Sequence, residues 1–119
     1  MPSIVRKITK FTKIEIDYLF AQARRVFRDP SCVMLLAPRQ KDFGRVLIIA
    51  SRKVGNAPER NILRRRIKAI FYEEKLFERP FDFVIILHKK AVALSFDQLK
   101  NFILNAYKKE MVAHESSNN

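Results

Sequence analysis

The apolar residues of this chain form continuous blocks and spaced stripes, which predict strands and helices respectively. Three blocks are apolar at nearly every position and rich in Val, Ile and Leu: Cys32 to Ala37, Arg45 to Ser51 and Phe81 to Leu87. Arg24 to Arg28 is an optional further short strand, which Asp29-Pro30 interrupts. Because the blocks do not alternate, they predict a sheet covered on both faces, or a sheet that keeps one face apolar for a ligand.

The spaced stripes predict three helices. The first runs from about Lys13 to Ala23 and opens with a capping box, Thr12 to Glu15, whose side chains serve free backbone N–H groups. The second follows the Gly55-Asn56 turn, ends near Phe77 and buries one stripe: Leu63, Ile67 and Ile70. The third begins at a similar box, Ser95 to Gln98.

These elements predict one α+β domain over residues 1–110, a sandwich with the order α-β-β-α-β-α. The optional short strand near Val26 would add one β to this order. Residues 1–10 are basic and lack periodicity, so we interpret them as an arm. Residues 111–119 lose all pattern and are predicted to be a disordered C-terminal tail.

Positive charge dominates the composition. The 119 residues carry a formal net charge of +12 and have an isoelectric point near 10.3. This balance favours a nucleic-acid partner over an acidic membrane surface. The single cysteine, Cys32, excludes an intrachain disulfide and fits a reducing compartment. Since no apolar run approaches the roughly eighteen residues that a membrane span needs, we expect a soluble, cytoplasmic protein.

The second predicted helix has an unfavourable charge for a helix that stands alone. A helix N-terminus favours nearby acidic side chains, yet the first turns hold four arginines and only Glu59 against them: Arg60, Arg64, Arg65 and Arg66. A polyanion lying across the helix would turn this repulsion into attraction. The alternative is a basic face that is simply solvated. We interpret the arc of Arg60, Asn61, Arg64, Arg65 and Lys68 as a phosphate-binding surface.

No residue pattern predicts an active site formed by the protein itself. A nuclease site would need clustered metal-binding carboxylates or a histidine pair. Most carboxylates lie in helix faces, caps or loops, and His88 and His114 lie at a strand end and in the tail. The sequence shows no P-loop, zinc or nucleophile-elbow motif. We therefore expect a binding module with no catalytic residue and no metal held by the protein.

The turn before the second helix carries a specific motif. It reads Lys53-Val54-Gly55-Asn56-Ala57, then Arg60-Asn61, then Arg64-Arg65. This motif resembles the signature of the bacterial ribonuclease P protein component, in which a K-x-G-x-A turn precedes R-N and a basic pair. The agreement covers residues 6–109 in order. The departures are Ile62, where the family often has arginine, and Pro58-Glu59, which replaces a usually apolar pair.

The resemblance implies both a fold and a role. The fold is ribosomal protein S5 domain 2-like, with an unusual left-handed βαβ crossover. The role is that of the protein subunit of an endoribonuclease, ribonuclease P, whose catalytic RNA holds most of the magnesium and removes the 5′ leader from precursor tRNA. No membrane and no further protein partner is implied. The implied contacts with the catalytic RNA lie at the turn and on the second helix: Arg52, Lys53, Arg60, Asn61, Arg64, Arg65 and Lys68.

The resemblance also implies a cleft for the single-stranded leader between the sheet and the first helix. We expect Tyr18, Phe20 and Met34 to line this cleft. Phe20 matches an aromatic position of the family, and simple core packing is the alternative for it. Ile16, Ser31 and Met34 stand where the family often has aromatic residues, so leader contacts are expected to be weaker or shifted to Tyr18.

Two other functions fit the same residues. One is a structural, ribosome-associated RNA-binding protein, and the other is a nonspecific nucleic-acid chaperone. Neither would support turnover when mixed with the catalytic RNA and a leader-bearing precursor tRNA, so reconstitution separates them from the ribonuclease P subunit.

Overall fold

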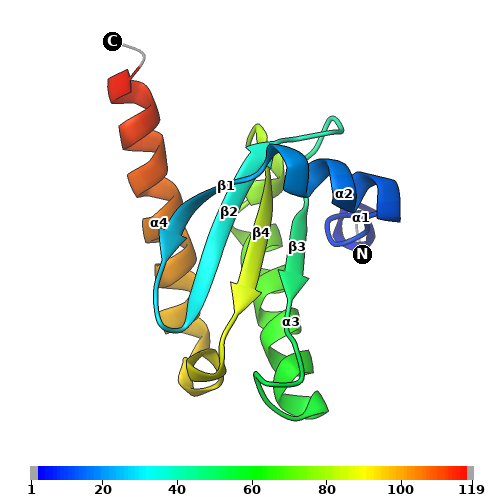
Figure 1. The fold of residues 1–119 in the computed structure, drawn as a ribbon, viewed down its shortest axis with the longest axis vertical. Coiled ribbons are helices and arrows are strands. Elements are labelled where there is room, and N and C mark those ends of the chain that lie inside the picture. Colours follow the sequence, from blue (N-terminus) through cyan, green and yellow to red (C-terminus); the bar gives the residue numbers. More distant parts are fainter. Residues whose placement is uncertain (1–2, 118–119) are drawn as a thin grey trace.

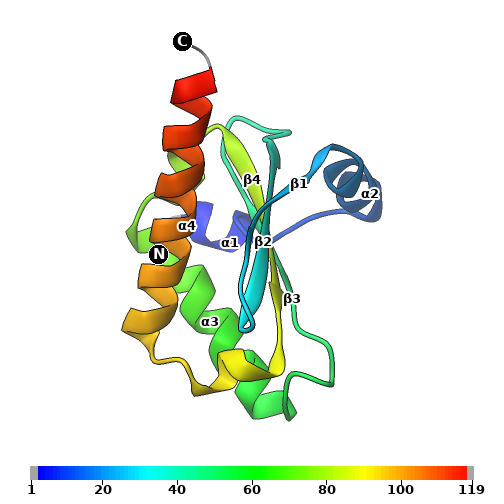
Figure 2. The same cartoon turned by 60° about the vertical axis from the view of Figure 1, so that its left-hand side comes forward.

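The computed structural model describes residues 3–117, and the side chains of residues 4–111 within them. A four-stranded sheet carries helices on both faces (Figures 1 and 2), which confirms the predicted α+β class. Two short 3-10 helices, η1 (Leu76–Glu78) and η2 (Lys89–Ala93), flank the last strand. The other elements run in the order α1 (Ser3–Lys7), α2 (Lys13–Gln22), β1 (Arg24–Arg28), β2 (Cys32–Pro38), β3 (Val46–Ile49), α3 (Ala57–Glu73), β4 (Phe81–Leu87) and α4 (Phe96–Ser117).

The sheet has the strand order β1-β2-β4-β3, and the optional strand near Val26 is present as β1. β3 and β4 are parallel, whereas the other two pairs are antiparallel. In Figure 1 both parallel strands run downward, β4 lies to the left of β3, and α3 joins them behind the sheet. This path is a left-handed crossover, the rarer hand for a βαβ unit.

The main core lies between the sheet and the two long helices, α3 and α4. Met34, Phe83 and Ile85 point to this side and are at most 1% exposed. They meet the predicted stripe of α3, Leu63, Ile67 and Ile70, which is buried as expected. Edge-to-face packing of Phe71 on Phe83 ties α3 to the centre of the sheet.

The other face of the sheet is also apolar, but α2 alone lies against it and crosses only one end (Figures 1 and 2). Leu19 of α2 is fully buried against Ala37 and Val84. Most strand residues around this contact remain only half-buried. We call this surface the open face and define it by Val33, Leu35, Leu47, Ile49, Val84 and Ile86. The strands lack alternation because both faces are apolar and one of them is only partly covered.

The N-terminal segment is more than the arm that we predicted. It contains α1, and Ile8 is fully buried in the main core. The Val46 N–H donates a 2.8 Å hydrogen bond to the Ile8 carbonyl, so the segment is fixed at the start of β3.

At the other end, α4 continues through Ser117, beyond Met111, where the predicted tail begins. Alanine and glutamate in this stretch favour helix even after the apolar stripe ends. Residues 118–119 lie outside the described part of the chain.

The predicted helix starts are confirmed and one helix end is wrong. The box of Thr12 and Glu15 closes with hydrogen bonds of 2.8 and 3.2 Å, and the box that opens α4 closes at 2.9 and 3.1 Å. α3 ends at Glu73, before the predicted end near Phe77. Lys75 adopts a left-handed conformation with φ of 53°, which cannot continue the helix.

Candidate nucleic-acid interface

The first turn of α3 uses its one acidic side chain as a cap. The Asn56 side chain accepts a 2.9 Å hydrogen bond from the Glu59 N–H, and the Glu59 carboxylate accepts one of 2.9 Å from the Asn56 N–H. This capping box was not predicted from the sequence, although its Asn-x-x-Glu spacing is visible there. The arginine side chains that follow add their positive charges to the positive end of the helix dipole.

A basic face of α3, which we define by Asn61, Arg64, Arg65 and Lys68, lies beside the edge strand β3. The three cations of this face line a hollow of about 300 Å³ together with Leu47 and Ile48. A neighbouring hollow brings Arg64 and Arg65 to Asn61. The structure thus brings together four of the seven residues that we predicted to bind RNA.

The remaining basic residues of this region have different surroundings. Arg52 and Lys53 are exposed in the turn before α3. Arg60 is half-buried, and its Nε atom is enclosed without a hydrogen-bond partner among the described atoms. Arg66 lies on the other side of the buried stripe and donates a 3.0 Å hydrogen bond to the Leu94 carbonyl. Arg66 therefore ties α3 to the segment before α4.

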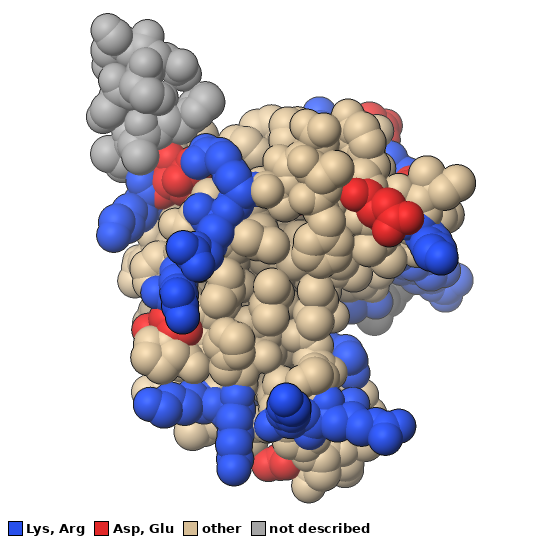
Figure 3. Space-filling view, in the orientation of Figure 1, with Lys and Arg blue, Asp and Glu red and all other residues tan. Residues whose placement is uncertain are grey.

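The open face and the basic residues share one side of the molecule. Figure 3 shows a central area free of charged side chains, with Lys and Arg along its left side and below it. The uncharged centre corresponds to the part of the sheet that α2 does not cover in Figure 1. The face thus combines an apolar floor with cationic borders.

A buried arginine fixes α2 over its end of the open face. Arg45 is 1% exposed, and its Nη1 donates hydrogen bonds to the Lys10 carbonyl at 2.8 Å and to the Glu15 carboxylate at 3.1 Å. Its guanidinium lies 4.1 Å from the centre of the Phe11 ring. The Thr12 N–H and then Arg45 lower the pKa of Glu15 from 4.5 to about 2. The ionised carboxylate therefore joins the start of α2 to the start of β3.

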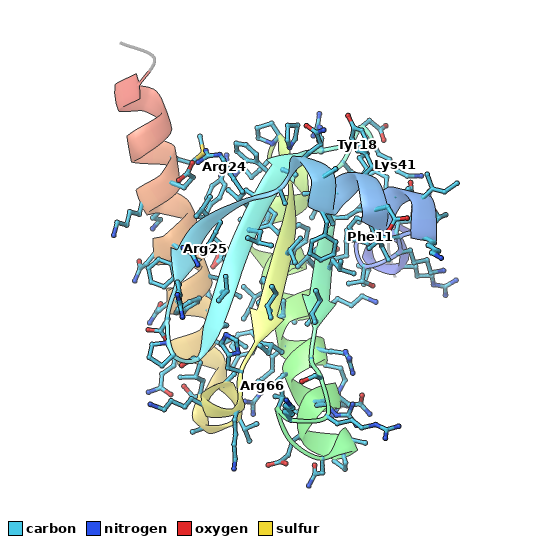
Figure 4. All side chains as sticks on the ribbon, in the orientation of Figure 1. Phe11, Tyr18, Arg24, Arg25, Lys41 and Arg66 are labelled. Carbon is cyan, nitrogen blue, oxygen red and sulfur yellow. The ribbon has the colours of Figure 1, made fainter. Side chains whose placement is uncertain are left out.

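The three residues predicted to bind the leader differ in their exposure and in the surface on which they lie. Tyr18 and Phe20 are 55% and 43% exposed. They are two positions apart on α2 with the buried Leu19 between them, so they lie on opposite flanks of the helix. Tyr18 lies toward Lys41, on the flank of α2 that faces away from the uncovered sheet (Figure 4). Phe20 therefore lies on the flank that borders the uncovered part.

The prediction for Met34 is wrong. This side chain is fully buried and belongs to the main core, on the far side of the sheet from the open face. Successive strand residues point to opposite faces, and its neighbour Leu35 occupies the open face instead. Both alternating sets of side chains in this strand are apolar. The sequence alone therefore does not show which set faces the cleft.

Among the described residues, no group of three or more His, Cys, Asp or Glu side chains is placed to hold a metal ion. Burial raises the pKa of the Cys32 thiol to about 12, so this cysteine remains protonated and is a poor nucleophile. No helix in the described part of the chain is long and apolar enough to cross a membrane.

These features define a class of small basic α+β domains in which a left-handed crossover places a basic helix beside an apolar sheet face. A family model described as Ribonuclease P matches residues 7–110. The chain belongs to this family, as the motif in the α3 region suggested, and is therefore a ribonuclease P protein component. This membership implies a part in tRNA processing.

Individual relatives support the same assignment. The chain is 34% identical to the ribonuclease P protein component of Halalkalibacterium halodurans over 110 residues, covering 91% of this chain and 87% of the relative. It is 38% identical to that of Bacillus velezensis over 80 residues, covering 67% and 68%.

Solved structures confirm the fold. The ribonuclease P protein of Staphylococcus aureus superposes with a TM-score of 0.74 at 20% identity, covering 87% of this chain and 94% of the other. The Thermotoga maritima protein gives a TM-score of 0.71 at 24% identity, covering 85% and 96%. At these sequence identities, the two structures support only the assignment of the fold.

Proposed function

We propose that this chain binds the catalytic RNA of ribonuclease P and the 5′ leader of precursor tRNA, and assists removal of the leader in the cytoplasm. The observation that carries the proposal is the position of the basic face of α3 at the edge of the open face. One surface suits the phosphates of a folded RNA, and the other suits the exposed bases of a single strand.

The basic face of α3 suits the RNA core. Arg64 and Arg65 lie side by side over two hollows, and the helix dipole adds positive potential at their end of α3. Each arginine that neutralises a phosphate releases counterions, which favours binding without requiring a particular base. The face therefore anchors the protein rather than selecting a sequence.

The open face suits the leader. Bases of a single strand can lie on its half-buried aliphatic side chains, and Phe20 offers a ring for stacking at its border. Since Ile16 and Ser31 supply no rings, stacking is sparser than the family pattern implies, and the aliphatic floor takes a larger share of the contact.

In this proposal the catalytic RNA holds the magnesium ions and activates the attacking water. The protein contributes binding and orientation, because holding the leader and the RNA core together positions the scissile bond. The alternative, a structural ribosome-associated protein with the same fold, would need the same basic surface but no effect on cleavage.

Reconstitution tests the proposal. The purified chain, freed of RNA, is expected to cleave no precursor tRNA, whereas addition of the cognate catalytic RNA at low magnesium gives leader removal that exceeds the rate of the RNA alone. Cleavage by the protein after exhaustive RNA removal would contradict the assignment of chemistry to the RNA. An unchanged rate on adding the protein would favour the structural alternative.

A further inference from the structure

The open face has a second basic border at β1, on the opposite side from α3. Arg25 and Arg28 are exposed, and the sheet register pairs Arg25 with Leu35 and Arg28 with Val33. Leu35 and Val33 are two positions apart on β2 and therefore share a face, which is the open face. Because paired residues of neighbouring strands lie on the same face, the side chains of Arg25 and Arg28 both lie on the side of the open face. Figure 4 shows Arg25 at this border.

A β-bulge creates this arrangement. Strand residues three positions apart normally point to opposite faces. The register shifts between Arg25 and Phe27, so Val26 is the extra residue. Val26 and Phe27 both pack against the main core, and Phe27 stacks edge-to-face on Phe102 of α4. The bulge thus sends two apolar side chains to the core and both arginines to the open face.

The register extends these contacts into two rows that cross the whole sheet. In order from β1 to β3, the rows are Arg25, Leu35, Val84, Leu47 and Arg28, Val33, Ile86, Ile49. Each row begins with an arginine and passes over aliphatic side chains to the edge strand β3, where Leu47 of the first row lines the same hollow as the basic face of α3. Three strand spacings of about 4.8 Å separate the outer strands, so the apolar floor is about 14 Å wide.

Charged side chains on an edge strand can also serve only to block pairing with another sheet. That role does not require the two arginines to face the same side. In the described part of the chain, neither Arg25 nor Arg28 has a carboxylate at ion-pair distance, whereas Arg24 of the same strand pairs with Glu110 of α4. Arg25 and Arg28 are therefore available to an external anion.

We propose that Arg25 and Arg28 bind backbone phosphates of a single-stranded RNA whose bases lie on the open face. This inference rests on the proposed function, which places the leader on this face, and it adds a phosphate-binding border on the side away from α3. The strand is held on both sides of the floor, which fixes its path across the sheet.

The test uses the full chain and an unstructured oligoribonucleotide of about ten nucleotides, within the usual site size of such surfaces. The variant is Arg25→Gln/Arg28→Gln. Its control is Lys108→Gln/Lys109→Gln, which removes the same charge from exposed positions on α4. We expect the first variant to lose on the order of tenfold in affinity, and its slope of log K against log salt to flatten by about 1.4.

The control is expected to keep a slope close to that of the natural chain, and thermal unfolding should show both variants folded. Equal behaviour of the two variants would overturn the inference, as would a natural chain that does not bind the oligoribonucleotide at all. The proposed function fails separately, by a lack of faster leader removal when the protein joins the catalytic RNA. A first variant that loses oligoribonucleotide affinity but still binds the catalytic RNA supports the inference alone.

Discussion

At the scale of single residues, the arginines of α3 separate into two groups by what they touch. Arg64 and Arg65 line hollows at the surface, and Arg64 makes only a long hydrogen bond of 3.4 Å to the Ala50 carbonyl, whereas Arg66 donates one of 3.0 Å to the Leu94 carbonyl. The motif shows that basic residues are abundant here, and the helical period separates Arg66 from the others. Side-chain contacts decide which cations remain free for phosphate.

Arg64→Gln/Arg65→Gln is expected to weaken binding to the catalytic RNA and to flatten its salt dependence by about 1.4 to 1.8 in the slope of log K against log salt. Stability should change little, because Arg65 is exposed and Arg64 loses only a long hydrogen bond to the Ala50 carbonyl. Arg66→Gln is the matched control, with a loss of stability and a smaller change in slope. A melting temperature that falls in the double variant, with an unchanged slope, would contradict this division.

Phe20→Ala is expected to weaken binding of leader-bearing precursor tRNA by about 1–3 kcal/mol, if the ring stacks on a base, and to leave mature tRNA unaffected. Since Phe20 is 43% exposed, its removal should cost less stability than the roughly 3–5 kcal/mol of a buried phenylalanine. Ile14→Ala is the control, since Ile14 is 81% exposed on the same helix. Equal losses for both tRNA forms in a destabilised protein would instead indicate a packing role.

Leu35 and Met34 show what the sequence could and could not predict at this scale. Their block was correctly predicted as a strand, because it is a short apolar run with Pro30 before it and Pro38 at its end. Which of the two faces the core depends on where the helices pack, and this is a tertiary property. The β1 bulge is equally hidden, because Arg25 and Arg28 share a face only after the chain inserts Val26 as an unpaired residue.

At the scale of elements, the capping boxes and the buried stripe of α3 were predictable because they depend on local spacing. The end of α3 and the packing of the N-terminal segment were not. Ile8 is held by a strand that begins far along the chain, and its burial follows from β3 rather than from any local pattern. The link between α2 and β3 through Glu15 and Arg45 is long-range in the same way.

This link predicts a pH-dependent contribution to stability. Because the folded pKa of Glu15 lies near 2 and its ordinary value is 4.5, the ionised carboxylate stabilises the fold above about pH 4.5, and this contribution is lost as the pH falls toward 2. Glu15→Gln keeps a capping side chain but removes the charge beside Arg45. The variant should be less stable near neutral pH, and the difference should shrink in acid.

Denaturant midpoints between about pH 7 and pH 3 measure this difference. Asp17→Asn, which removes an exposed carboxylate from the same helix, is the control and should show no such convergence. A constant gap between Glu15→Gln and the natural chain across this range would contradict the role given to the ion pair.

At the scale of the whole molecule, the left-handed crossover places α3 behind the sheet and at its free edge, so that the basic face and the open face adjoin. The resemblance implied this hand, whereas the general rule for βαβ units favours the other. The proposed function depends on this adjacency, since one rigid unit would hold an RNA core and a single strand at a fixed separation.

The most direct test compares the complex of catalytic RNA and protein with the RNA alone, for affinity toward precursor tRNA and toward mature tRNA. We expect the protein to increase affinity for the precursor and to leave affinity for the mature form nearly unchanged, because in the proposed function the open face contacts only the leader. An equal increase for both forms, or none for either, would contradict the proposed role of the open face.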